Sequence, residues 1–324
     1  MTDINEFCHL HLHSTFSILD GENMLDNITK RVKELGMKQV ALTDHGTMMG
    51  SLNFYKACKK ENLKPILGVE AYMTNDEDGM IKEERTKDNF HLVLVAENEV
   101  GYKNLLDLVS RAQLTNFYHK PRISKKNLLV PGAIEGVIAT SACLGNEVNR
   151  VGKWNAETSE YDDKPAMYKA AEFYQSVFGD KYYLEIQDND DSAGQQKIYN
   201  EIVIQMGKDL GIKNVITSDA HYTDVKSSEL HALLMAMQLK KTLEEYQSAG
   251  EMKYGPWFFI RSPQQMLDAA IKYNCESAFW NACEIGNKCA LSIELGKYKT
   301  PEFDITSELD YKEFLASCEG DIDE

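Results

Sequence analysis

The chain has 324 residues, of which 43% are hydrophobic, and a formal net charge of −16 at pH 7. This length suits a single α/β barrel, and no run approaches the roughly 20 apolar residues of a membrane span. So acidic a chain is a poor general binder of duplex DNA, because affinity for DNA rests on Lys and Arg. The seven scattered cysteines lack a CxxC pair and the N-terminal residues lack a signal-peptide pattern, so we expect a reducing, cytoplasmic location and no membrane partner.

Buried strands alternate with helices along most of the chain. Helical spacing of apolar residues appears between the strands, for example over residues 24–35 and 198–210. Most of the strand runs are apolar without alternation, which is typical of strands buried on both faces. The seven predicted strands are residues 7–13, 39–43, 65–69, 91–96, 136–140, 182–187 and 214–218. This pattern predicts a mostly parallel sheet or barrel with right-handed crossovers.

The pattern changes in the C-terminal part of the chain. After about residue 225 it becomes helical, and the tail from Pro301 is acidic. We therefore predict a metal-binding barrel domain over residues 1–290 and a C-terminal extension or linker over residues 291–324. Two polar segments, residues 75–89 and 152–164, are predicted to be surface excursions.

Two short motifs each place two metal-type ligands at positions i and i+2. They are His11-Leu12-His13 at the end of the first strand and Asp219-Ala220-His221 beyond the last. Side chains two apart on a strand share a face, so each motif can direct two ligands to one point. His45 also follows an apolar strand. Because the carboxyl ends of barrel strands build the active site, these residues predict a multinuclear metal site.

Further candidate ligands lie at other strand ends. Asp20 follows the first strand, Glu70 ends the third and Cys143 lies beyond the fifth, whereas His91 begins its strand and is not selected by the barrel rule. Singly, each has a structural explanation, such as a hydrogen-bonded His, a small buried Cys or a capping Asp. Their coincidence favours a metal site, and His, carboxylate and one Cys suit zinc, manganese or iron.

Other chemically suggestive residues are expected to play lesser parts. His9 shares a strand face with the first His pair and is expected to support it or to be structural, and His231 is expected to be structural. The basic stretch 119–122 could touch phosphate, but we expect a solvated loop. The Asp321-Ile322-Asp323 sequence is similar to a polymerase metal pair but belongs to the tail.

An ordered set of motifs resembles the PHP family, the polymerase and histidinol phosphatase domains. These motifs are HxHSxxSxxDG (11–21), TDHG (43–46), GVEAY (68–72), FHL (90–92), TSACLGN (140–146) and SDAHY (218–222). Further segments are similar to the N-terminal domain of bacterial DNA polymerase III α subunits (DnaE type), namely residues 54–55, 64–66, 101–105, 117–123 and 185–187. The resemblance covers essentially the whole chain.

The resemblance implies a distorted seven-stranded (β/α) barrel, the PHP fold, with additional C-terminal helices. It also implies a catalytic site in which nine residues bind two or three divalent transition metals, zinc, manganese or iron. Grouped by metal, these residues are His11, His13, Glu70 and Asp219 for one, Glu70, His91 and Cys143 for a second, and Asp20, His45 and His221 for a third. The resemblance therefore includes His91, which the barrel rule does not select.

For function, the resemblance implies a metal-dependent phosphoesterase, and in polymerase-linked PHP domains a 3′→5′ exonuclease that proofreads the primer end. Two alternatives stay open: a catalytically silent, metal-braced module that stabilises a polymerase and docks partners, and a small-molecule phosphatase of the histidinol-phosphatase type. The polymerase-like segments count against the phosphatase. Expected partners are the DNA primer 3′ end, other replisome subunits, and a polymerase palm and fingers region in the same full-length chain or a separate subunit.

Overall fold

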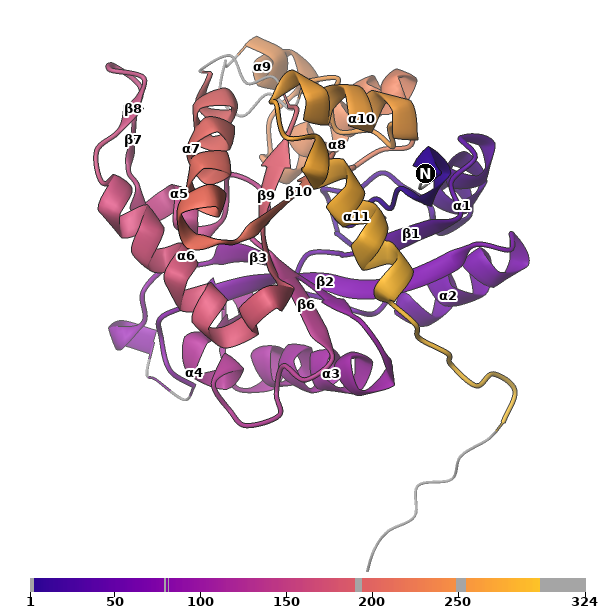
Figure 1. Ribbon diagram of the computed structural model, residues 1–324, viewed down its shortest axis with the longest axis horizontal. Helices are drawn as coiled ribbons and strands as arrows, with labels where there is room; N and C mark the ends of the chain where they lie inside the picture. The colour runs from indigo at the N-terminus through magenta and orange to yellow at the C-terminus, as the bar shows by residue number, and fades with distance from the viewer. Residues whose placement is uncertain (1–2, 79, 81, 190–193, 249–254, 298–324) are drawn as a thin grey trace, which may run out of the picture. The chain divides into compact units, whose positions relative to one another are not determined.

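The computed structural model describes residues 3–78, 80, 82–189, 194–248 and 255–297 (Figure 1). The chain divides into two compact units, Met1–Ser292 and Ile293–Glu324. Most of the second unit, including the Asp321-Ile322-Asp323 sequence, lies outside the described residues. The domain limits expected from the sequence, 1–290 and 291–324, therefore stay a prediction.

A curled sheet forms the centre of the first unit, in the distorted seven-stranded barrel expected for the PHP fold. Its strands, in spatial order, are β1 (Gln39–Leu42), β2 (Lys64–Thr74), β3 (Phe90–Ala96), β6 (Val137–Thr140), β9 (Tyr182–Gln187) and β10 (Lys213–Thr217). All four residues of β6 and all six of β9 are buried. Apolar runs without alternation therefore mark strands that are covered on both faces.

The first predicted strand lies between the two ends of this sheet. It is an extended segment that makes isolated bridges instead of a regular strand. On one side the amide of Ala41 donates to the carbonyl of His9 at 2.9 Å. On the other side the amide of Ala220 donates to the carbonyl of His11 at 3.2 Å, and that of His13 to the carbonyl of Ala220 at 2.8 Å. The segment thus links β1 to β10 and completes the set of seven.

One strand runs against the predicted parallel direction. β3 is antiparallel to both β2 and β6, whereas β1 and β2, β6 and β9, and β9 and β10 are parallel pairs. The register pairs Tyr72 with His91. Because β3 is reversed, its first residues lie at the end of the barrel where the parallel strands finish. The barrel rule misses His91 because it assumes that all strands share one direction.

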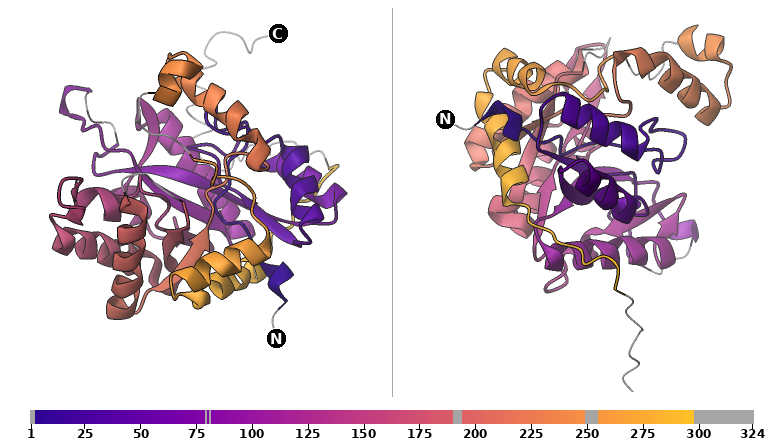
Figure 2. Two further views of the ribbon diagram at one scale, coloured as in Figure 1. Left: turned by 90° about the horizontal axis from the view of Figure 1, so that it is seen from above. Right: turned by 90° about the vertical axis from the view of Figure 1, so that its right-hand side faces the viewer.

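Helices surround the curled sheet (Figures 1 and 2). In the first 224 residues they are α1 (Leu25–Glu34), α2 (Ser51–Lys60), α3 (Glu99–Leu114), α4 (Lys125–Leu128), α5 (Glu147–Val151), α6 (Lys164–Phe178) and α7 (Gln195–Leu210). Asn98 caps α3 by accepting from the Gly101 amide, and Asp163 caps α6 by accepting from the Ala166 amide. The helices predicted over residues 24–35 and 198–210 correspond to α1 and α7.

The helical C-terminal part adds four helices to the first unit within the described residues. They are α8 (Ser228–Gln238), α9 (Leu243–Ser248), α10 (Pro263–Lys272) and α11 (Glu276–Lys288). Phe279 of α11 stacks on Phe7 with ring centroids 4.9 Å apart, which anchors this helix to the first extended segment. None of the helices that the structure describes is long and apolar enough to cross a membrane.

The remaining strands are short. β4 (Phe117–Tyr118) and β5 (Lys120–Ser124) form an antiparallel pair, and β5 also pairs in parallel with the far end of β2. The second predicted surface excursion contains a hairpin of β7 (Trp154–Asn155) and β8 (Glu160–Tyr161). The placement of β5 matters for the site because it carries Lys120 to the end of the barrel where the candidate ligands lie.

Candidate metal centre

All nine candidate ligands come together at one end of the barrel. Seven of them lie where the sequence predicts, either at the end of a strand or in the loop after the first segment: His11, His13, Asp20, His45, Cys143, Asp219 and His221. His91 reaches the same end because β3 is antiparallel. Glu70 was expected to end its strand, but β2 continues to Thr74, so Glu70 lies within it and bridges to His45.

The Glu70 carboxylate lies at the centre of the cluster and is fully buried. Its Oε1 atom is 3.2 Å from His11 Nε2 and 2.8 Å from His91 Nδ1. Its Oε2 atom is 2.5 Å from His45 Nδ1 and 3.5 Å from His13 Nε2. The two oxygens thus face different pairs of imidazoles, an arrangement that fits the bridging role predicted for Glu70.

Asp219 completes one side of the cluster. Its Oδ1 atom lies 3.1 Å from His11 Nε2, 3.2 Å from His13 Nε2 and 3.6 Å from His221 Nδ1. Its backbone has φ of +50°, a left-handed conformation that is uncommon for residues other than glycine. Strained backbone of this kind persists where the surrounding structure holds it, and it is concentrated at functional sites.

Two further contacts lie on the other sides of the cluster. Cys143 Sγ is 3.4 Å from His91 Nδ1 and 3.7 Å from Glu70 Oε1. Asp20 Oδ2 is 2.7 Å from His45 Nε2 and 3.8 Å from His221 Nε2. His45 therefore contacts both Asp20 and Glu70, so the grouping by metal that the resemblance implies stays a prediction.

The side chains present fit a metal centre. The atoms His11 Nε2, His13 Nε2, Glu70 Oε2 and Asp219 Oδ1 are buried and make no hydrogen bond within the described part of the chain. Buried polar atoms are normally hydrogen-bonded, and here they face one another instead. Three overlapping groups place their ligand atoms within 4.8 Å of one another: His13, His45 and His221; His11, His13 and Glu70; and His45, Glu70 and His91. Imidazole, carboxylate and thiol together suit zinc, manganese or iron.

The electrostatics of the cluster follow from its burial. Burial acts to raise the pKa of Glu70, but the imidazoles of His91 and His45 outweigh it and hold that pKa well below its usual value. Burial and the neighbouring His45 lower the pKa of His13 well below its ordinary 6.5. Burial raises the pKa of the Cys143 thiol well above its usual value, and the charge of Glu70 adds to the effect. Ionised Glu70 and neutral His13 are the forms that bind metals, whereas the Cys143 thiol must lose its proton to do so.

A buried carboxylate behind the cluster orients His11. Glu185 Oε1 lies 2.8 Å from His11 Nδ1. The same carboxylate accepts hydrogen bonds from the hydroxyls of Thr140 and Thr217 and from the Gln187 amide, at 2.5, 2.5 and 2.8 Å. Sequence reasoning did not assign Glu185 to the site. A charged residue inside the otherwise buried run YYLEIQ was the signal that could have found it.

Asp44 holds His13 in a similar way. His13 Nδ1 is 3.0 Å from the Ser17 hydroxyl, which donates to Asp44 Oδ1 at 2.8 Å. Asp44 also accepts from the Ser14 amide and hydroxyl, at 2.7 and 2.8 Å. These contacts fix the orientation of the imidazole. Such outer partners commonly support metal-binding histidines.

The other two histidines singled out in the sequence lie beside the cluster. His9 Nε2 is 2.8 Å from the carbonyl oxygen of Arg261, and its Nδ1 is 3.0 Å from the Ser218 hydroxyl. Burial lowers the pKa of His9 to about 4. His231 on α8 is buried, with its ring 5.6 Å from that of His221. His9 is thus a hydrogen-bonded support of the first segment.

The basic stretch 119–122 is not the uniformly solvated loop expected from the sequence. Arg122 is only 1% exposed and pairs with Asp76 at 2.9 Å. It also donates to the carbonyls of Thr86 and Asp88. Arg122 is therefore a structural residue that fastens the 75–89 excursion to β5. Lys120 is exposed and lies over the ring of Tyr72.

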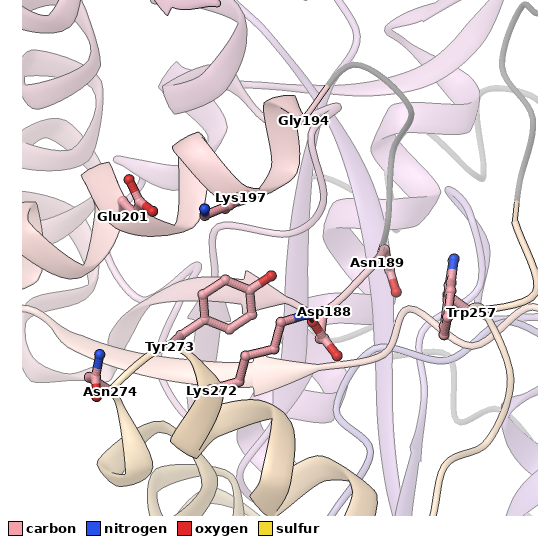
Figure 3. Close-up of a pocket in the computed structure, with 9 residues that line it drawn as sticks. All are labelled: Asp188, Asn189, Gly194, Lys197, Glu201, Trp257, Lys272, Tyr273 and Asn274. Atoms are coloured by element: carbon pink, nitrogen blue, oxygen red, sulfur yellow. Dashed lines mark hydrogen bonds and ion pairs between the residues drawn. The ribbon is translucent and has the colours of Figure 1, made fainter.

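A separate cavity of about 560 Å³ opens beside β9 and α7 (Figure 3). Figure 3 shows the Lys272 ammonium beside the Asp188 carboxylate, an ion pair of 2.7 Å, with Lys197 and Glu201 on one side and Asn189 on the other. None of the nine candidate ligands lines it. A hydrogen bond of 3.0 Å from Asn189 to Gln187 connects its edge to the partners of Glu185.

Comparison with known proteins supports the sequence resemblance. Residues 9–189 match the family model described as PHP domain. Among curated relatives, DNA polymerase III subunit alpha from Helicobacter pylori (strain ATCC 700392 / 26695) is 41% identical over 302 residues, which is 91% of this chain and 24% of the relative. The protein of the same name from Aquifex aeolicus (strain VF5) is 35% identical over 322 residues, 96% of this chain and 27% of the relative. The chain thus spans about a quarter of the length of these relatives.

Solved structures give a more distant likeness. An amidohydrolase from Chromobacterium violaceum is 14% identical with a TM-score of 0.43, and the match covers 66% of this chain and 87% of that one. A two-domain protein from Bacteroides vulgatus, described as containing a predicted PHP-like metal-dependent phosphoesterase, is 13% identical with a TM-score of 0.33, over 68% of this chain and 55% of that one. Both values are low, so neither likeness bears on the chemistry of the site.

Proposed function

The chain belongs to the PHP domain family, and from this premise we propose that it is a metal-dependent phosphoesterase that removes nucleotides from the 3′ end of a DNA strand. The names of its relatives support a place in DNA replication. The proposed setting is a replisome, in which the polymerase palm and fingers lie in the same full-length chain or in a separate subunit. The proposed cofactors are two or three zinc, manganese or iron ions held by the nine clustered residues.

The observation that carries this proposal is the uneven burial of the cluster. The side chains of Glu70, His11 and His13 are 0% exposed, whereas those of Asp20, His45 and His91 are 12%, 13% and 21% exposed. The centre is therefore closed on the barrel side and open on one side. A catalytic metal centre must admit its substrate, whereas a structural one is closed by its protein ligands. An open side favours hydrolysis over the purely structural role.

Divalent metals bound at such a site supply Lewis acidity and a nucleophile at neutral pH. In the proposed reaction a water oxygen forms a bond to the terminal phosphorus as the bond from phosphorus to the 3′ oxygen of the preceding nucleotide breaks. One water proton ends on that leaving oxygen and the other goes to solvent. The products are a nucleoside 5′-monophosphate and a strand shorter by one nucleotide. Glu70 lies between four imidazoles. As a bridging ligand it would set the distance between two of the metal ions.

The test is a manganese-supplemented assay on primer-template DNA with a 3′ label, run beside a phosphomonoester substrate. We expect release of labelled mononucleotide. We expect Asp20→Asn to cause a larger proportional loss of turnover than of the free energy of unfolding. Asp107→Asn is the matched control, because this carboxylate is 59% exposed on α3 and pairs with Arg111. Equal residual activity in wild type and Asp20→Asn would mean contamination and would support the structural module. Faster hydrolysis of the phosphomonoester would support the small-molecule phosphatase.

A further inference from the structure

A cavity of about 250 Å³ lies against the open side of the metal centre. The candidate ligands Asp20 and His45 form part of its wall. The rest of the wall comes from the loop after the first segment, the loop before α2, Tyr72 of β2, the end of α3, the start of β5 and the end of α8, with Phe16, Ile18, Met49, Gln113 and Lys120 among its residues. A molecule in this cavity would therefore contact the centre directly.

Lys120 brings an ammonium group to the wall of this cavity. The basic residues that follow it are each paired with a carboxylate: Arg122 with Asp76, Lys125 with Glu147, and Lys126 with Glu77. Within the described residues no carboxylate forms an ion pair with Lys120, whose ammonium lies 5.1 Å from the centre of the Tyr72 ring. The Lys120 ammonium therefore has no paired carboxylate in the described part of a chain whose net charge is −16.

The fold fixes the start of β5 beside the centre. The Tyr72 ring stacks on the imidazole of His45, with centroids 5.8 Å apart and planes 18° apart. Gly46 has φ of +60°, and a Cβ there would lie 2.8 Å from Pro121 and 3.0 Å from the Tyr72 ring. Only glycine permits this close approach without strain. Lys120, next to Pro121, is therefore held in place relative to His45.

Another part of the wall is apolar and exposed. Ile18 is 80% exposed and Met49 is 78% exposed, although both line the cavity. Phe16 is half-buried and packs on the start of α2, where a Cβ on Gly50 would lie 2.9 Å from its ring. Phe16, Ile18 and Met49 gather in one cavity, and grouped apolar side chains, unlike scattered ones, mark binding surfaces.

We propose that this cavity binds the terminal nucleotide of a DNA strand, with the Lys120 ammonium on a phosphate oxygen and the base against Phe16, Ile18 and Met49. A positive group and apolar groups in the wall of one cavity match the two halves of a nucleotide, since charged contacts bind phosphate and aromatic side chains stack on bases of any sequence. The inference rests on the proposed function and names the part of the substrate that this site selects.

The test separates binding from cleavage. The metal-loaded chain is titrated with a 5′-labelled oligonucleotide in which a methylene group replaces the bridging oxygen of the last linkage, and binding is followed by fluorescence anisotropy. We expect Lys120→Gln to raise Kd about tenfold through loss of the charged hydrogen bond. We also expect it to raise KM with little change in kcat and no change in metal content. Lys120→Arg should restore most of the binding.

Lys103→Gln is the matched control, because this exposed lysine on α3 pairs with Glu99 and is expected to leave Kd, KM and metal content unchanged. Phe16→Ala should weaken binding of the oligonucleotide and of a nucleoside monophosphate competitor, but not of inorganic phosphate. If inorganic phosphate competes as well as the nucleotide in wild type, the base contacts are excluded and the proposal is overturned.

Failure of this inference is distinguishable from failure of the proposed function. Unchanged Kd and KM in Lys120→Gln, with active wild type, would overturn the inference and leave the exonuclease intact. Binding that depends on Lys120, without release of nucleotides by wild type, would overturn the exonuclease and support the nucleotide site.

Discussion

At the scale of single residues, the candidate centre depends on side chains that do not themselves face the proposed metals. Glu185 is buried, and its carboxylate is shared by His11, two threonine hydroxyls and an amide. Asp44 holds His13 through the Ser17 hydroxyl. An imidazole that is already fixed in tautomer and direction loses less freedom when it binds a metal. Glu185 and Asp44 should therefore influence the affinity of the site for metal.

We expect Glu185→Gln to weaken metal binding about 10- to 100-fold while all nine candidate ligands remain, because the substitution removes the charge that orients His11. Competition with a chromophoric chelator measures the affinity. Glu99→Gln, an exposed carboxylate on α3, is the control. Equal affinity in wild type and Glu185→Gln would show that the carboxylate serves the fold alone.

Loss of a ligand should appear in stability as well as in metal content. We expect His13→Ala and Asp219→Asn to retain fewer metal ions and to melt at a lower temperature than wild type when metal is present, because binding to the folded state adds stability by mass action. Thermal melts with added metal and with chelator measure the effect. The difference from wild type should shrink in chelator, and an unchanged melting temperature with metal present would contradict the prediction.

At the scale of elements, the reversed strand β3 brings His91 to Glu70. β2 and β3 approach closely at Gly68, where a Cβ would lie 2.4 Å from the carbonyl oxygen of Leu94. Glu70 lies two residues further along the same strand. The glycine therefore sets the spacing between the two strands that carry Glu70 and His91.

We expect Gly68→Ala to lower the free energy of unfolding by about 1–3 kcal/mol, since the added methyl group must displace one strand. Metal content should fall as well, because Glu70 moves with β2. Denaturant titration and metal analysis measure both. Gly211→Ala is the control: its φ is +69° and no atom lies within 4 Å of the added Cβ, so only the backbone cost is expected and metal content should be unchanged. Normal metal content in Gly68→Ala would show that the strand spacing at Gly68 does not affect metal binding.

At the scale of the whole molecule, charge limits what the chain can do by itself. The net charge of −16 leaves little basic surface for DNA, and Arg122, Lys125 and Lys126 are neutralised within the chain. The chain also spans only about a quarter of the length of its curated relatives. In the binding mode that we propose, Lys120 contacts a single phosphate, which is too little to hold a duplex.

We expect the chain alone to release nucleotides slowly and with a high KM. A palm and fingers region from a relative should raise the rate mainly by lowering KM, because it adds basic contacts to DNA. Steady-state kinetics with and without that region measure the effect. The chain alone should incorporate no nucleotide, since the palm carboxylates have no counterpart among its motifs. Template-directed extension by the pure chain, or a gain in kcat without a change in KM, would refute these expectations.

The sequence by itself determined the fold class and the residue types of the centre. Apolar runs without alternation mark strands buried on both faces, and the i, i+2 spacing in His11-Leu12-His13 predicts a pair of ligands on one face of an extended segment. These are local properties, set by the period of a strand and by side-chain chemistry, so one sequence is enough to read them.

Only the tertiary structure decided which residues meet. The direction of β3 brings its first residue, His91, to the ligand end, and strand direction depends on pairing between segments far apart in the chain. Burial of Arg122 with Asp76 and exposure of Lys120, two residues apart in one basic stretch, likewise follow from how β5 pairs with β2. Glu185 meets His11 across 174 positions of sequence. Such contacts depend on the closure of the whole barrel, and no local pattern encodes them.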